Sequence, residues 1–407
     1  MCRPRRTERK EVNVMKFPRF PLPAMPALCA AAGMLSGSAA ARAQDAADGW
    51  ARALPGWRYE FPRDHFTHRD FKTEWWYVTG RVRAASGKRF GYQFTIFRRG
   101  LRPPLEQAAV RSHWVVNDLP LGHFALTDEQ GARFYYQQRL VRGAFGEAGF
   151  PLPGGGAGQS TAATGTDTRL AWIGDWAIGL TEEGSFSVKA LQPGAALDLQ
   201  LRPRRQPVIN GNDGVSQKSG GAGNASHYYS MPRLETTGTV TVEGRAEPVT
   251  GLSWLDREWA TNQLAEGQIG WDWLSLHLSD GSDLMIYQLR GKDGKADEYS
   301  SGTLIGPDGA VEHLTHRDFS LTPVPGHEWR SVKSGGVYPI LWQAELPAKN
   351  LKLEVRAVLP DQELALNPVS YWEGAVDASG TRGTGKLEAE GYLEMTGYSG
   401  ALKALRE

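Results

Sequence analysis

Hydrophobic and polar residues alternate with a period of two in several stretches of this chain. The alternation runs over residues 90–97, 197–202 and 351–357, and a Ser-Gly pair at 86–87 precedes the first stretch. A period of two sends successive side chains to opposite faces of a strand, so each stretch predicts a half-buried β-strand. No stretch offers a helical period of similar length. The pattern therefore predicts an all-β protein whose strands are joined by tight turns.

The same order of strand-forming stretches occurs twice along the chain. Each copy begins with an aromatic triplet, continues through a leucine-rich strand, and ends with a tyrosine-containing triplet and a hairpin. These triplets are Trp75-Trp76-Tyr77 and Tyr228-Tyr229-Ser230 in the first copy, and Trp271-Asp272-Trp273 and Ser370-Tyr371-Trp372 in the second. Such a repeat indicates two similar units, and closing each sheet would remove its exposed edges. We expect two tandem antiparallel lipocalin-like β-barrels, over residues 44–262 and 263–407, with a seam near Thr261 to Glu266.

The composition agrees with this fold and narrows the range of partners. The 407 residues suffice for two cores, and 14 Trp, 13 Tyr, 14 Phe and 48 Gly suit aromatic-rich strands joined by turns. The 46 Lys and Arg residues nearly balance the 45 Asp and Glu residues, and no long basic run occurs beyond the extreme N-terminus. We therefore expect no nucleic-acid partner.

The N-terminal segment has the pattern of an export signal. Two basic residues precede an apolar stretch over residues 22–35, and Ala41-Arg42-Ala43 fits a small-residue cleavage site. A membrane anchor is the competing interpretation, but prolines interrupt the stretch, and it is shorter than the roughly 20 apolar residues of a spanning helix. We expect a signal peptide within residues 1–43, cleavage near Ala43, and a periplasmic or secreted protein. The start codon is Met1 or Met15.

Cysteine and histidine usage argues against a metal centre. Both cysteines, Cys2 and Cys29, fall in the segment expected to be removed, so the mature chain lacks disulfides, thiolate catalysis and zinc–thiolate sites. His65 and His68 could form a metal site with nearby aspartates. On an extended strand, however, residues three apart face opposite sides and make poor co-ligands. We expect neither a metal nor another cofactor.

Two long segments, residues 151–165 and 210–225, are rich in glycine and small polar residues. They contain too little apolar area to form a core, so we expect surface loops there. The second segment directly precedes His227 and could act as a lid over a site, with a disordered loop as the alternative.

The hexapeptide Trp254-Leu255-Asp256-Arg257-Glu258-Trp259 is the most informative motif of the sequence. As a strand, it places Trp254, Asp256 and Glu258 on one face and the other three residues on the opposite face. Inside a barrel, burial and the like-charged neighbour would keep at least one carboxyl neutral, as a general acid near neutral pH requires. Alternatively, Arg257 and other arginines pair with these acids in a salt-bridge network.

These motifs resemble the AttH and carotenoid 1,2-hydratase family of secreted tandem lipocalin-like proteins. The resemblance covers about Phe61 to Tyr398 and rests on Thr73-Glu74-Trp75-Trp76-Tyr77, the hexapeptide 254–259, Gly270-Trp271-Asp272-Trp273, Tyr392 and Gly397-Tyr398. In the hydratases of this family, a His-x-Trp pair is followed by a Tyr-x-Asp pair whose aspartate donates the proton. This chain keeps the spacing as His227-x-Tyr229 and Trp254-x-Asp256, with the two aromatic types exchanged.

The resemblance implies a cofactor-free addition of water to an isoprenoid double bond. In such a reaction a carboxylic acid protonates the alkene, aromatic rings stabilise the carbocation, and water captures it. The residues that would catalyse it are Asp256, His227, Tyr229 and Trp254. The neighbouring acidic and aromatic residues of the motifs are candidates for binding the substrate, namely Glu74, Trp75, Trp76, Tyr228, Glu258, Trp271 and Trp273.

One function is favoured by the sequence, and two others remain as alternatives. The first is binding of an apolar small molecule, a lipid or isoprenoid, because barrel mouths are common sites for such ligands. The second is a hydro-lyase that uses Asp256 as general acid. The third is an accessory protein of an envelope ABC-type exporter. Large exposed aromatic patches would favour the exporter partner, whereas an enclosed aromatic pocket around Asp256 favours the first two functions. The sequence leaves the oligomeric state open.

Overall fold

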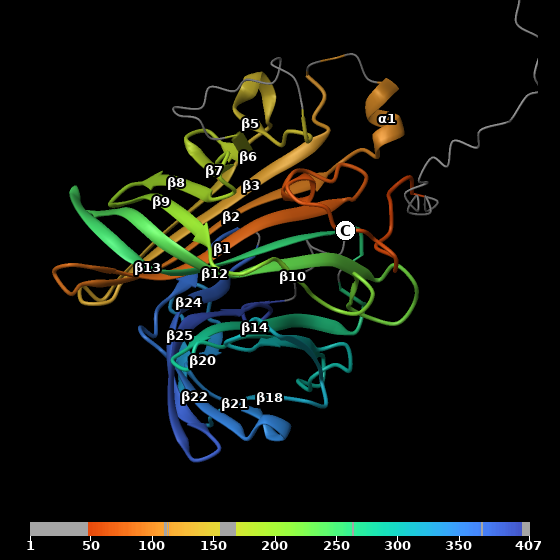
Figure 1. Ribbon diagram of the computed structural model, residues 1–407. Helices are drawn as coiled ribbons and strands as arrows, with labels where there is room; N and C mark the ends of the chain where they lie inside the picture. The colour runs from red at the N-terminus through yellow and green to blue at the C-terminus, as the bar shows by residue number, and fades with distance from the viewer. Residues whose placement is uncertain are drawn as a thin grey trace, which may run out of the picture. The chain divides into compact units, whose positions relative to one another are not determined.

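The alternating stretches form long antiparallel strands, as their pattern predicts. The computed structural model describes residues 48–109, 112, 114–154, 168–262, 264–367 and 369–400, and β-strands dominate these ranges (Figure 1). The predicted signal peptide, its cleavage site, both start codons and both cysteines lie outside the described residues. No helix in the described ranges is long and apolar enough to cross a membrane.

The first sheet uses the strands of the first repeat. They are β1 (Thr73–Ala84), β2 (Arg89–Gly100), β3 (Asp118–Asp128), β4 (Arg133–Leu140), β5 (Ala148–Gly149), β6 (Thr168–Ile173), β7 (Trp176–Leu180), β8 (Phe186–Gln192), β9 (Ala195–Pro203), β10 (Val208–Ile209), β11 (Ser216–Gln217), β12 (Ala225–Val242) and β13 (Arg245–Ala260). Within the described residues their order across the sheet is β4-β3-β2-β1-β13-β12-β9-β8-β7-β6-β5, with β10 and β11 paired to β12. The described part of this half also contains the short helix α1 (Pro104–Ala109) and the 3₁₀ turns η1 (Arg63–His65) and η2 (Ala144–Gly146).

The second sheet uses the strands of the second repeat. They are β14 (Gln268–Leu278), β15 (Asp283–Gly291), β16 (Ser301–Ile305), β17 (Val311–Thr315), β18 (Ser320–Pro323), β21 (Leu341–Leu346), β22 (Leu351–Ala357), β23 (Glu363–Leu364), β24 (Tyr371–Arg382) and β25 (Gly385–Met395). Their order is β17-β16-β15-β14-β25-β24-β22-β21-β18, with β23 paired to β24. A separate ribbon joins β19 (Glu328–Arg330) to β20 (Val337–Pro339), and η3 (Pro347–Lys349) precedes β22.

The two sheets repeat one strand order. The run β4-β3-β2-β1-β13-β12-β9-β8 in the first sheet corresponds to β17-β16-β15-β14-β25-β24-β22-β21 in the second. Both sheets are antiparallel and curl into half-barrels, so the predicted all-β, tandem lipocalin-like fold class is confirmed. The chain passes from the first sheet to the second between Ala260 and Gln268. The limits 44–262 and 263–407 as separate folding domains stay a prediction.

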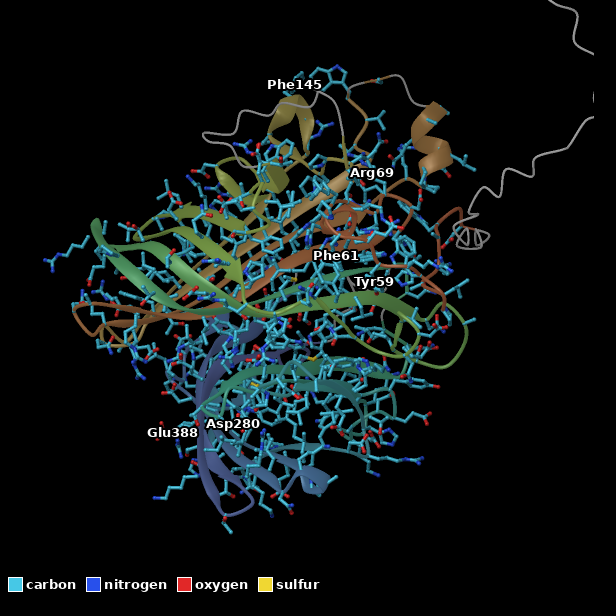
Figure 2. All side chains as sticks on the ribbon, in the orientation of Figure 1. Tyr59, Phe61, Arg69, Phe145, Asp280 and Glu388 are labelled. Carbon is cyan, nitrogen blue, oxygen red and sulfur yellow. The ribbon has the colours of Figure 1, made fainter. Side chains whose placement is uncertain are left out.

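Apolar side chains gather in a core inside each curl and in a further cluster that joins the two sheets. The described residues belong to one compact unit, Ala41–Glu407, and side chains occupy the space within and between the ribbons (Figure 2). The joining cluster combines Tyr77 and Trp254 of the first sheet with Trp273 and Tyr392 of the second. Strand β1 packs on β25 and β2 packs on β24. The outer faces of the two curls therefore form a shared interior, and this interior contains the candidate site.

Candidate active site

Strand β13 places the two carboxyl groups of the hexapeptide on its face toward the second sheet. Asp256 and Glu258 line a cavity between the sheets, whereas Leu255 and Trp259 are buried in the core of the first sheet. Trp254 lies on the Asp256 side, in the cluster that joins the sheets. The predicted division of the motif between two faces is therefore confirmed, and one face carries acids into apolar surroundings.

The cavity has a volume of about 350 Å³, which lies within the usual range for small-molecule sites. Both sheets contribute its wall, and aromatic or aliphatic side chains form most of it. Examples are Trp75, Phe97 and Leu121 from the first sheet and Trp271, Trp273 and Leu289 from the second. An apolar molecule would exchange water for hydrocarbon contacts in this space.

The carboxyl group of Asp256 is buried in the cavity wall among three hydrogen-bond donors. Tyr228 Oη donates to Oδ2 at 2.6 Å, and the Ser230 hydroxyl and the Trp254 indole donate to Oδ1 at 2.5 and 2.6 Å. Burial raises the pKa of Asp256 to about 7, the charge of Glu258 adds to the rise, and the three donors oppose it. At neutral pH both protonation states of Asp256 are therefore populated, as proton transfer in either direction requires.

Two further carboxyl groups, Glu373 and Glu394, line the cavity from the second sheet. They are cross-strand neighbours on β24 and β25. Burial raises the pKa of Glu394 to about 7; the charge of Asp256 adds to the rise and the Trp271 indole opposes it. Burial, followed by the charge of Glu394, raises the pKa of Glu373 well above its ordinary value. The cavity therefore holds acids that are at least partly protonated at neutral pH on both of its sides.

Asp256 and Glu394 occupy equivalent positions in the two repeats. Tyr77 of β1 lies opposite Asp256 of β13, and Trp273 of β14 lies opposite Glu394 of β25. Because β1 and β13 correspond to β14 and β25 in the common strand order, the duplicated fold supplies one carboxyl from each copy to the same cavity.

Glu258, the second acid of the hexapeptide, is paired with a cation. Lys218 Nζ lies 3.1 Å from Glu258 Oε1 and 4.2 Å from the centroid of the Tyr287 ring. Burial alone would lower the pKa of Lys218, but the charge of Glu258 outweighs burial and raises it. Lys218 belongs to the segment 210–225, so this predicted surface loop supplies a buried side chain to the cavity. Glu258 thus has a counterion, whereas Asp256 forms no ion pair within the described part of the chain.

Two predicted catalytic residues, His227 and Tyr229, lie on the face of β12 that points away from the cavity. In the register with β13 they are opposite Trp259 and Arg257, and directly opposed residues share a face. The expected grouping of His227 and Tyr229 around Asp256 is therefore wrong. Tyr228, which lies between them, and Ser230 supply the hydroxyl groups that donate hydrogen bonds to the Asp256 carboxyl.

Glu74 and Trp76, predicted to bind substrate, also point away from the cavity. Glu74 forms buried ion pairs with Arg98 and Arg257, and the Arg257 guanidinium lies 3.8 Å from the centroid of the Trp76 ring. Although burial raises it, these arginines hold the pKa of Glu74 well below its ordinary value. The salt-bridge network expected as the alternative thus exists, but on the face opposite Asp256. The structure therefore corrects the placement of Glu74 and Trp76, which belong to this network and do not line the cavity.

His65 and His68 lie in the segment before β1 that covers this same face. Tyr59, labelled in Figure 2, belongs to that segment. His65 Nδ1 lies 2.7 Å from Tyr229 Oη, and the His68 ring stacks on Trp259 with centroids 3.7 Å apart. Across the described residues, no group of three or more His, Cys, Asp or Glu side chains is arranged to hold a metal ion. The two histidines contribute to packing and hydrogen bonding there.

The remaining predicted binding residues line the cavity: Trp75, Tyr228, Glu258, Trp271 and Trp273. Sequence reasoning missed Lys218, Glu373 and Glu394. The repeat did contain a signal for Glu394. In the second copy, the strand after the Ser370-Tyr371-Trp372 triplet has an acid, Glu394, at the position equivalent to Asp256 in the first copy. Lys218 gave no such signal, since its segment has the composition of a surface loop.

The fold and the cavity define a tandem lipocalin-like protein with an apolar site that carries buried carboxyl groups. The chain belongs to the AttH-like family, whose model matches residues 52–398.

Two curated relatives match part of the sequence. Dehydratase asqC of Emericella nidulans is 25% identical over 182 residues, which are 44% of this chain and 50% of that protein. Kievitone hydratase of Fusarium solani subsp. phaseoli is 22% identical over 176 residues, which are 42% of this chain and 49% of that protein. The chain thus spans about half the length of the curated relatives it matches.

Solved structures resemble nearly the whole fold. A protein described as an AttH from Nitrosomonas europaea is 32% identical, with a TM-score of 0.73 that covers 86% of this chain and 99% of that chain. Kievitone hydratase from Nectria haematococca is 14% identical, with a TM-score of 0.63 that covers 88% of this chain and 98% of that chain. The second likeness concerns the fold alone.

Proposed function

We propose that this protein is a cofactor-free hydro-lyase that adds water to, or removes it from, a carbon–carbon double bond of an apolar substrate in the cavity. The observation that carries the proposal is the Asp256 carboxyl, which is buried beside an apolar space without a cation partner in the described part of the chain. Burying such a carboxyl is unfavourable, and ligand binding alone would not need it. Proton transfer to carbon does need an acid that keeps its proton near neutral pH.

In the direction of hydration, protonated Asp256 gives its proton to one alkene carbon, and the π electrons form the new C–H bond. The positive charge on the adjacent carbon is stabilised by the aromatic rings of Tyr77 and Trp273, whose centroids lie 5.2 Å apart. A water oxygen then bonds to this carbon, and its proton passes to ionised Glu394. Asp256 ends ionised and Glu394 ends protonated, and exchange with solvent restores both. Dehydration follows the same steps in reverse.

The names of the two relatives, a dehydratase and a hydratase, describe the two directions of this reaction. Their partial coverage gives no substrate for this chain. The wall of the cavity favours a hydrocarbon body, such as a lipid or an isoprenoid, and the volume of about 350 Å³ suits one small molecule.

The proposal is tested by incubating the purified protein in D₂O with acyclic isoprenoid alkenes and the corresponding tertiary alcohols. Mass spectrometry should detect the gain or loss of one water, with one deuterium bound to carbon after hydration. Replacing the acid in Asp256→Asn should lower the rate at least about a hundredfold, which is typical for a positioned general acid. Ligand binding, which is measured by the quenching of tryptophan fluorescence, should persist.

Asp272→Asn is the matched control. Asp272 is equally buried on β14 of the second sheet, burial raises its pKa to about 6, and it pairs with Arg290 at 3.0 Å without lining the cavity. Folded Asp272→Asn protein should keep its turnover. Retention of most activity by Asp256→Asn would overturn the assignment of the acid, and ligand binding without any conversion by the parent protein would make it a binding protein.

We also propose that the protein is exported, on the basis of the N-terminal pattern of basic, apolar and small residues. N-terminal sequencing of protein recovered from the periplasm or medium should begin near Gln44. Recovery of the intact chain from the cytosol alone would contradict export.

A further inference from the structure

One end of the cavity carries an arginine, Arg99, that forms no ion pair with an acid of the described residues. Thr95, Phe97 and Arg99 of β2 all line the cavity, as the alternation of the strand requires. The Arg99 side chain is half-buried and donates to Thr73 Oγ1 at 2.8 Å. Among the residues that the structure describes, it takes part in no ion pair. The exposed side chain of Leu140, which also lines the cavity, marks the solvent-facing part of the wall.

The neighbouring arginine shows how this chain treats a buried guanidinium that serves the fold. Arg98 points to the other face of β2, is fully buried, and pairs with both Glu74 and Asp118. Arg99 faces the cavity and has neither partner. Arg98 thus has the acidic partners expected of a buried arginine that stabilises the fold. Arg99 lacks them, as expected of an arginine that binds a ligand.

The other charges of the cavity do not compensate Arg99. Among the acids, Glu258 is already paired with the Lys218 ammonium at 3.1 Å, and burial keeps Asp256 and Glu394 partly protonated near neutral pH. This end of the cavity is therefore electropositive, and an anion placed there would form charge-assisted hydrogen bonds with a guanidinium.

The strand register gives the separation between this end and the proposed acid. Tyr77 is opposite both Thr95 and Asp256, so these residues lie at one level of the sheet. The four steps from Thr95 to Arg99 span about 13 Å along an extended strand. Phe97 and Trp75 line the wall between the two levels.

We propose that the ligand of this cavity is an amphipathic carboxylate, with its carboxylate on Arg99 and its hydrocarbon body along the aromatic wall toward Asp256. The assignment of the ligand carboxylate to Arg99 depends only on where Arg99 lies in the cavity wall, whether or not the protein is an enzyme. Its connection to turnover rests on the proposed function, because the double bond of such an acid would then lie at the level of Asp256. Arg99 is thus a specificity-determining residue for an acid over the corresponding ester or alcohol.

The test uses cis-parinaric acid and its methyl ester as fluorescent probes, with equilibrium titration of the full chain at pH 8. The parent protein should bind the acid at least tenfold more tightly than the ester. In Arg99→Gln the affinity for the acid should fall to that for the ester, while the affinity for the ester stays unchanged. Arg99→Lys should restore part of the preference. Arg83→Gln, at the far and exposed end of β1, controls for net charge and should behave as the parent protein.

Equal affinity for acid and ester in the parent protein, or no binding of either, would overturn the proposal. An equal loss of both affinities in Arg99→Gln would also overturn it, because that result assigns Arg99 to the fold. Asp256→Asn separates this proposal from the proposed function: it should keep the preference for the acid. A preserved preference combined with undiminished turnover in Asp256→Asn would reject the catalytic acid and leave the anion site standing.

Discussion

Asp256 should make the folded protein less stable as the pH rises. The carboxyl ionises near pH 3.8 in an unfolded chain and near pH 7 in the folded protein. Between these values the folded state holds a proton that the unfolded state has lost, so the free energy of unfolding falls by about 1.4 kcal/mol per pH unit. The contribution is complete below pH 3.8 and is lost as the pH passes through about 7.

The magnitude follows from the separation of the two pKa values. About three pH units at about 1.4 kcal/mol each give a loss of about 4 kcal/mol. This is a large fraction of the roughly 5–15 kcal/mol by which typical domains are stable. An Asp256 held in an ion pair would have the opposite sign, since a cation lowers the pKa and stability then grows as the pH rises.

Asp256→Asn isolates this contribution, because it removes the titrating proton and keeps the size of the side chain. Urea unfolding of the parent and the variant, followed by tryptophan fluorescence between pH 4 and pH 8, yields the free energy of unfolding at each pH. The difference, parent minus variant, should fall by about 4 kcal/mol toward high pH, since other groups titrate in both proteins. A flat difference, or one that grows with pH, would refute the claim that burial dominates the pKa of Asp256.

Three further substitutions test neighbouring parts of the structure. Lys218→Met leaves Glu258 buried without its counterion, so the free energy of unfolding in urea should fall by about 3–5 kcal/mol, and Glu258→Gln in the same chain should recover most of the loss. Tyr228→Phe removes the donor that lies 2.6 Å from Asp256, so the pKa of the carboxyl should rise further and the pH–rate profile should move to higher pH; a move to lower pH would contradict this. Glu74→Gln removes the carboxylate shared by two buried arginines and should cost about 3–5 kcal/mol of stability without a change in ligand affinity by fluorescence titration; a selective loss of affinity would show contact with ligand.

The direction of each side chain on β13 was predictable from the sequence, because alternation along an extended strand is a local property. It correctly placed Asp256 and Glu258 on one face and Arg257 on the other. The tandem fold was predictable for a related reason, since the same aromatic and turn residues recur in the same order. Local pattern thus determined the sheets and the face that carries the site.

The neighbours across the strands were not predictable, because register depends on long-range pairing. The ladder between β12 and β13 shifts between Met231 and Leu234, and a shift of one residue exchanges the faces of a whole strand. The resemblance to the hydratase motif selected His227 and Tyr229, whereas the register brings Tyr228, which lies between them, to Asp256. Lys218 was missed because composition measures the average polarity of a segment and gives no information on one buried side chain within it.

The equivalence of Asp256 and Glu394 also bears on how a site of this kind can originate. Two identical half-barrels that associate about a twofold axis present the same face to each other. One acidic substitution in that face then yields two carboxyl groups across a single cavity. Once both copies are joined in one chain, each can change separately. Ser230 is the cross-strand neighbour of Asp256, whereas Glu373 is that of Glu394, so the two equivalent acids have different neighbours in this chain and the pair is polarised.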